Sequence, residues 1–97
     1  MPETPAALDE SVTASPLIVA RPMDRGAILM NTSSGDCFEL NGVGALVWDL
    51  IGRGLALQGI VDAIVKAYDI DEATARADLL RLVDDLARQG IVRVIRR

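Results

Sequence analysis

One stretch decides the fold: residues 31–54 read NTSSGDCFELNGVGALVWDLIGRG. Residues 32–36 have the composition of a turn, and the short run Cys37–Leu40 that follows predicts a strand. Beyond Asn41 the apolar residues recur with helical spacing, at Val43, Leu46, Val47 and Leu50. We therefore expect a strand that passes directly into a helix, with Asn41 as the N-cap and the glycines near residue 54 as its end.

Upstream of this stretch, two aliphatic runs predict two more strands, at Leu17–Arg21 and Ala27–Asn31. Pro22 is expected to end the first of them. The second would form a hairpin with Cys37–Leu40 through a loop of about five residues, so the three strands predict a small antiparallel sheet. Residues 1–16 are rich in Pro, Ala, Ser, Thr and acidic residues without periodicity, which predicts a flexible N-terminal tail.

Downstream, the periodicity predicts two further helices and a last strand. One helix runs from about Leu55 to Ala67, and the next begins after an N-cap at Asp71 and ends in a left-handed cap at Gly90. Ile91–Ile95 alternates apolar and basic residues and predicts a short strand. The expected core stripes of the two helices are Leu57, Ile60, Val61, Ile64 and Tyr68, and Ala75, Leu79, Leu82 and Leu86, widened by Val83.

This order of elements predicts an α+β domain over residues 17–97. Its architecture is like a winged helix-turn-helix: a three-stranded antiparallel sheet followed by three helices. Trp48, the only tryptophan, precedes the glycines that end the first helix and is interpreted as a core anchor.

The composition excludes several classes of protein. The chain has 97 residues, a net charge of −4 and a pI of about 4.6, which argues against general nucleic-acid binding. It contains no histidine and one cysteine, so Cys-His and Ser-His pairs, the commonest metal ligand and an intrachain disulfide are all absent. We expect no catalytic residue, metal or cofactor, and hence no enzyme. Neither a secretion signal nor an apolar run of about 18 residues is present, which predicts a cytoplasmic protein.

Several segments resemble the PqqD-like family: residues 36–41, Val47–Leu50 with the glycine turn 52–54, residues 77–79, and then Leu82, Leu86 and residues 90–92. The resemblance extends over about Leu17 to Val94. It implies a recognition element for ribosomally synthesised peptides, a non-catalytic protein that binds the leader of a precursor peptide. Such proteins present the leader to a leader peptidase, a cyclase or a radical-SAM enzyme.

Two subgroups of the family compete. The hairpin with its Ser-Ser-Gly turn resembles the stand-alone leader-binding proteins of lasso-peptide pathways. The PQQ-pathway protein usually carries a proline-acid segment before its Leu-Asn, which this chain lacks. A peptide chaperone of PQQ biosynthesis remains the alternative.

The family resemblance implies that the leader adds as a strand beside the third predicted strand, in a cleft closed by the third helix. An edge strand without proline or lysine suits such an addition. The candidate leader-binding residues are Cys37, Phe38, Glu39, Leu40, Ala75, Asp78, Leu79, Leu82 and Asp85.

Their individual roles differ. Phe38 and Leu40 are expected to be largely buried with their backbone reachable, and Cys37 to pack rather than react. Asp78 and Asp85 either meet the leader or form a solvated helix face, and Leu79 is also compatible with plain core packing.

A winged-helix order also suggests DNA binding as a different class of function. Residues 69–85, which include most of the third helix, contain six acidic residues and two arginines, a balance of −4. Such a charge repels phosphate, so DNA binding is the weaker hypothesis.

Overall fold

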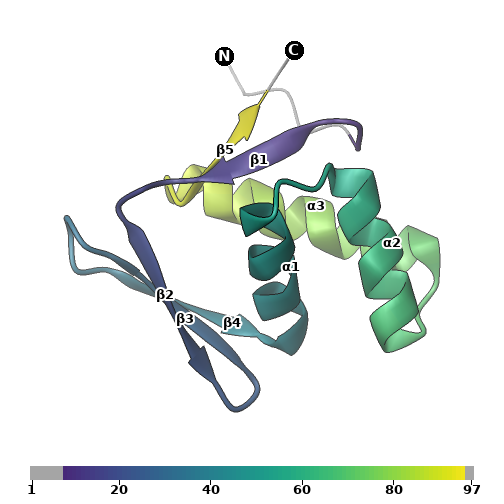
Figure 1. Cartoon of the computed structure of the whole chain (residues 1–97), viewed down its shortest axis with the longest axis horizontal. Helices are drawn as coiled ribbons and strands as arrows, with labels where there is room; N and C mark the ends of the chain where they lie inside the picture. The colour runs from purple at the N-terminus through teal and green to yellow at the C-terminus, as the bar shows by residue number, and fades with distance from the viewer. Residues whose placement is uncertain (1–7, 96–97) are drawn as a thin grey trace.

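Two antiparallel sheets and three helices form an α+β domain in the computed structural model, which describes residues 8–95 (Figure 1). The order is β1 (Ser11–Ala14), β2 (Ile18–Met23), β3 (Gly26–Asn31), β4 (Cys37–Asn41), α1 (Gly42–Gly52), α2 (Leu57–Tyr68), α3 (Glu72–Arg88) and β5 (Val92–Ile95). The predicted three-stranded sheet followed by three helices is confirmed.

The three-stranded sheet has the order β2-β3-β4, so β2 and β4 are both edge strands. The predicted hairpin between β3 and β4 is confirmed, and Asn31 holds its loop because its Oδ1 accepts the N–H groups of Ser33 and Ser34 at 2.8 and 3.1 Å. The expectation that Pro22 ends the first strand is wrong, since β2 continues to Met23. An edge strand tolerates proline where the missing N–H would point away from the sheet.

A second sheet joins the two ends of the described chain. β1 pairs antiparallel with β5, from Ser11 opposite Ile95 to Ala14 opposite Val92. The prediction of a flexible tail through residue 16 is therefore wrong for β1, whose Val12 is buried in the core. Residues 1–7 of that predicted tail lie outside the described residues.

The three helices begin and end largely where the sequence predicts. The Asn41 side chain accepts the Gly44 N–H at 2.8 Å and caps α1, as expected. At the end of α3, Gly90 has a positive φ of 74° and the Ile91 N–H bonds to the Leu86 carbonyl at 2.9 Å, which is the expected Schellman ending. Tyr68 departs from the prediction: it is exposed at the last turn of α2 rather than part of the core stripe.

The core lies between the sheets and the helices. α1 packs on β1, β3, β4 and α2, whereas α3 packs mainly on α2 and β5. The fully buried large side chains are Leu29, Val47, Leu57, Ile60, Val61, Ile64, Leu79, Val83 and Leu86. Within residues 8–95 no helix has both the length and the apolar character that crossing a bilayer requires.

Candidate peptide-binding site

The candidate site begins at the free edge of β4. One side of this strand pairs with β3, from Met30 opposite Cys37 to Gly26 opposite Asn41. The other side has no strand beside it within the described part of the chain. Such an edge presents unpaired backbone groups to any extended segment that approaches it.

The register determines which backbone groups point outward. Next to the hairpin loop the Asn31 N–H bonds to the Asp36 carbonyl at 2.8 Å. Bonded and non-bonded pairs alternate along an antiparallel ladder, so Phe38 and Leu40 bond to β3 and the N–H and C=O groups of Cys37 and Glu39 point outward. Within residues 8–95 no other backbone group forms a hydrogen bond with these outward N–H and C=O groups. The expectation that the Phe38 and Leu40 backbones are reachable is therefore corrected to Cys37 and Glu39.

The side chains of β4 divide between two faces. Leu40 is buried and Phe38 is half-buried against the core, on the face that α1 covers. Cys37 and Glu39 are exposed on the opposite face. The expectation that Cys37 packs is therefore wrong, because its place in the strand turns it away from the core. Leu40 therefore contributes to the site through its place in the strand, whereas Cys37 and Glu39 offer both backbone and side chain.

On α3, the structure divides the five predicted residues into two groups. Ala75 and Leu79 are fully buried in the core, so their side chains are out of reach and we remove them from the candidate site. Leu82 is half-buried at the edge of the core, while Asp78 and Asp85 are exposed. The reason is the helical phase: Ala75 and Leu79 lie on the central stripe with Val83 and Leu86, and the other three lie beside it.

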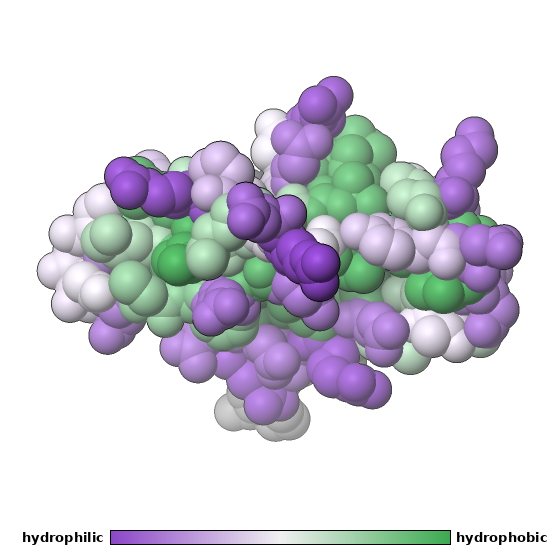
Figure 2. All heavy atoms as spheres, turned by 90° about the horizontal axis from the view of Figure 1, so that it is seen from below, coloured by the Kyte–Doolittle hydropathy of each residue, from purple (hydrophilic) through white to green (hydrophobic). Residues whose placement is uncertain are grey.

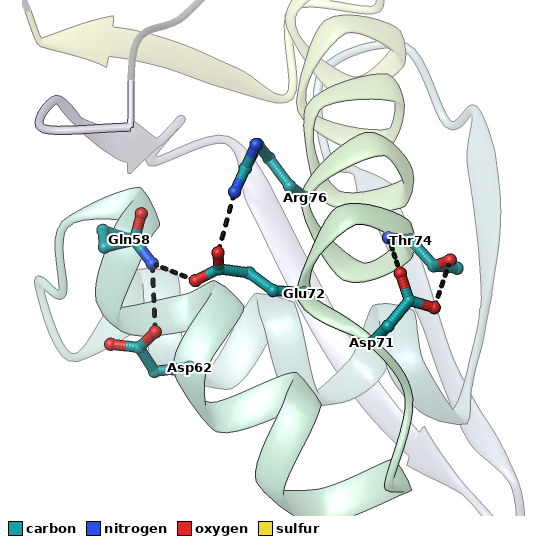
Figure 3. A network of polar contacts seen from close by, with 6 residues as sticks. All are labelled: Gln58, Asp62, Asp71, Glu72, Thr74 and Arg76. Carbon is teal, nitrogen blue, oxygen red and sulfur yellow. Dashed lines mark hydrogen bonds and ion pairs between the residues drawn. The ribbon is translucent and has the colours of Figure 1, made fainter.

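A polar network occupies the opposite flank of α3 (Figure 3). Gln58 of α2 donates to Asp62 at 3.0 Å and to Glu72 at 3.3 Å, and Glu72 in turn pairs with Arg76 at 2.8 Å. Figure 3 shows this network on the side of α3 that faces α2, with Thr74 on the other side. Residues three and four apart share a flank of a helix, so the flank of Thr74 is also that of Asp78, Leu82 and Asp85.

The start of α3 is fixed by Asp71, as the sequence predicts. Its carboxylate accepts the Thr74 N–H at 3.1 Å and the Thr74 hydroxyl at 2.8 Å. These two hydrogen bonds, the hydroxyl's first, lower the pKa of the Asp71 carboxyl below its ordinary value. The cap therefore favours the ionised carboxylate, and it holds the flank described above in place.

The exposed surface of α3 is acidic, with its charges partly paired. Arg81 lies 3.9 Å from Asp78, and Arg88 lies 3.0 Å from Asp84. Asp85 has no ion pair within residues 8–95. Exposed pairs of this kind contribute little to stability, and the helix presents no basic surface that would suit a DNA groove.

Tyr68 of α2 lies close to the end of β4, which its position in the sequence does not indicate. A Cβ atom placed on Gly42 would lie 3.4 Å from the Tyr68 hydroxyl, so the phenol reaches the point where β4 passes into α1. It is 43% exposed there. The helical spacing of the apolar residues from Leu57 to Ile64 continues to Tyr68 in the sequence, so the pattern predicts a core position. α2 ends immediately after Tyr68, however, and its side chain lies at the surface.

The comparisons with known proteins identify the family and support the fold. The family model described as coenzyme PQQ synthesis protein D (PqqD) matches residues 26–92. The solved structure of TbiB1 in complex with the TbiA(beta) leader peptide is 30% identical, with a TM-score of 0.77, and the match covers 82% of this chain and 93% of that one.

A second solved structure, lasso peptide synthetase B1 complexed with the leader peptide, is 23% identical with a TM-score of 0.78. That match covers 86% of this chain and 98% of the other, and at this identity it shows the fold alone. None of the curated proteins matches the chain. The family match extends over most of the chain and includes β3, β4 and all three helices, and the chain therefore belongs to the PqqD family.

Proposed function

We propose that this protein binds the leader segment of a ribosomally synthesised precursor peptide as an added strand along β4. The outward N–H and C=O groups of Cys37 and Glu39 are the observation that carries the proposal. They can pair with an extended peptide with little dependence on its sequence. The structures of TbiB1 and of lasso peptide synthetase B1 are both complexes with leader peptides, which supports leader binding by this chain.

Specificity then has to come from side chains beside the added strand. Phe38 and Leu82 are half-buried at the edge of the core, one on β4 and the other on the flank of α3 that α2 leaves free. They can receive apolar side chains of the peptide, while Asp78 and Asp85 lie farther out and can meet basic or hydroxyl groups. This arrangement gives the peptide two sides to contact, a strand edge and a helix flank.

The role is that of a non-catalytic adaptor. The protein would hold the leader in the cytoplasm and deliver the precursor to a modifying enzyme, such as a leader peptidase, a cyclase or a radical-SAM protein. The resemblance of the hairpin to lasso-pathway leader-binding proteins and the match to lasso peptide synthetase B1 support a lasso-peptide-type pathway over PQQ biosynthesis for this chain.

The proposal is tested by titrating the full chain into fluorescein-labelled synthetic leaders of the precursor peptides encoded beside its gene. We expect saturable anisotropy changes with one leader and none with a scrambled version of it. A PQQ-precursor peptide as competitor separates the two pathways, and random duplex DNA at moderate salt tests the weaker hypothesis.

Amide hydrogen exchange on the complex then tests the mode of binding. The N–H groups of Cys37 and Glu39 should exchange more slowly when the leader is bound, because they gain a partner. Those of Phe38 and Leu40 should change little, since they already bond to β3. Absence of binding to every leader overturns the function, and protection confined to α3 overturns strand addition.

A further inference from the structure

A hollow of about 550 Å³ opens at one end of the three-stranded sheet, next to the free edge of β4. It lies where β2 turns into β3. The residues that line it are Met23, Asp24, Arg25, Gly26, Glu39 and Leu40.

Gly26 lines the hollow from the middle strand of the sheet. The register aligns Met23, Gly26 and Asn41 in one row across the three strands. A Cβ atom at Gly26 would overlap the Leu40 carbonyl oxygen. Close approach of the two strands therefore requires glycine at this position.

The lining has a mixed chemistry. Met23 is 50% exposed and offers an apolar surface, while Asp24 and Glu39 bring two carboxylates and Arg25 one guanidinium. Within residues 8–95 none of these three charged groups takes part in an ion pair. The hollow thus has a net charge of −1, from two carboxylates and one guanidinium.

Figure 2 views the molecule from this end. Strongly hydrophilic residues project at the centre of the face, and apolar surface extends to the left, over the three-stranded sheet. Across the three strands, Arg21 of β2 lies in line with Glu39 of β4, and Ile28 of β3 lies between them. Two strand spacings amount to roughly 9–10 Å, and among the described residues Arg21 forms no ion pair with Glu39.

A peptide strand beside β4 places one side chain next to this hollow. Directly opposed residues of paired strands share a face, with Cβ atoms about 4.5–5.5 Å apart. The peptide residue opposite Glu39 therefore lies on the exposed face of the sheet, and a long side chain there can lean across Glu39 toward the hollow.

The geometry points to a subsite for a lysine or arginine of the leader at this position. The charged group of that side chain would lie beside Glu39 and point toward the hollow, which Asp24 also lines. This inference rests on the proposed function and names the kind of leader residue that the β4 edge selects. Charge complementarity across the strand pair, opposed in part by Arg25, is the physical basis of the selection.

The test uses the leader that binds in the titration above, synthesised as a series with lysine or glutamate at one position at a time. We expect one position at which lysine binds about twofold to fivefold more tightly than glutamate, as opposite charges on paired strands do. Glu39→Lys should reverse that preference, and Asp62→Lys, on the far helix α2, should leave it unchanged. High salt should reduce the preference, because the groups are exposed.

The possible results distinguish failure of this subsite from failure of the proposed leader-binding function. If the native chain binds the leader but Glu39→Lys reverses no preference, the subsite is wrong and the function stands. If the native chain binds no leader, both are overturned. Circular dichroism of each variant verifies that the comparison is made between folded proteins.

Discussion

The two edges of the same sheet differ in what they offer a visiting strand. At β2 the Thr32 N–H bonds to the Leu17 carbonyl at 2.8 Å, and the alternation from that pair turns Ile18, Ala20 and Pro22 outward. The Ile18 N–H already bonds to the Ser15 carbonyl at 3.1 Å, and Pro22 has none. Ala20 is left as the one outward donor of β2.

β4 presents the opposite case. Its outward residues Cys37 and Glu39 are consecutive in the ladder and both have an N–H group, and neither group has a partner within the described residues. The comparison teaches that the ability of an edge strand to accept another strand depends less on its composition than on which of its residues point outward. A single proline closes an edge only when it occupies an outward position, as Pro22 does.

The largest loss of leader affinity should come from placing a proline at an outward position of β4, as Pro22 is placed on β2. Glu39→Pro removes an outward N–H and leaves a peptide carbonyl unpaired, which costs roughly 1–3 kcal/mol, or about 5- to 150-fold in Kd. Ala20→Pro makes the same change on β2 and should leave the affinity for the leader unchanged. Anisotropy titration of both variants measures the difference.

Glu39→Ala separates the backbone effect from loss of the carboxylate, since it keeps the N–H group. Equal losses of affinity in Ala20→Pro and Glu39→Pro would mean that the peptide does not add at β4. Thermal melts of the three variants check that each remains folded.

A smaller effect is expected from the α3 flank of Leu82, the proposed second side of the site. Leu82→Asp replaces a half-buried apolar contact with a charge and should weaken leader binding about five- to tenfold, or roughly 1–1.4 kcal/mol. Leu80 is also half-buried but lies on the opposite flank of α3. Leu80→Asp should lower the melting temperature comparably and spare binding; a matching loss of affinity would show that α3 contributes stability alone.

The smallest effect concerns pH. The folded-state pKa of Asp71 lies below the ordinary value of 3.8, so its cap contributes fully above that pH and is lost as the pH falls through the folded pKa. Asp71→Asn should melt with a shallower pH dependence than the native protein between about pH 5 and pH 2. Asp85→Asn removes a carboxylate from the same helix and should retain the native slope in the circular dichroism melts.

Much of the fold could be predicted from the sequence because local signals agree with the tertiary structure. The change of period at Asn41 marks the passage from strand to helix, and Asp71 and Gly90 mark the ends of α3. The placement of the candidate site at β4 and α3 came from the family resemblance rather than from these local signals. Contact of the leader with those two elements stays a prediction.

The rest depended on information that is not local. β1 has a single buried side chain, Val12, and its partner strand lies at the other end of the chain. Which residues of β4 point outward depends on the register with β3, and a shift by one residue would exchange the two sets. The periodicity places Ala75 and Leu79 on one stripe of α3 but does not say how deeply each residue is buried.

The pairing of β1 with β5 has a consequence for how this domain combines with others. Ser11 and Ile95 lie opposite each other, at the end of the molecule far from the turn between β2 and β3 (Figure 1). A domain whose ends adjoin can be inserted into a surface loop of another protein with little disturbance to either. The same fold is therefore suited to act as a portable module, grafted at one point of a host enzyme while its β4 edge stays open.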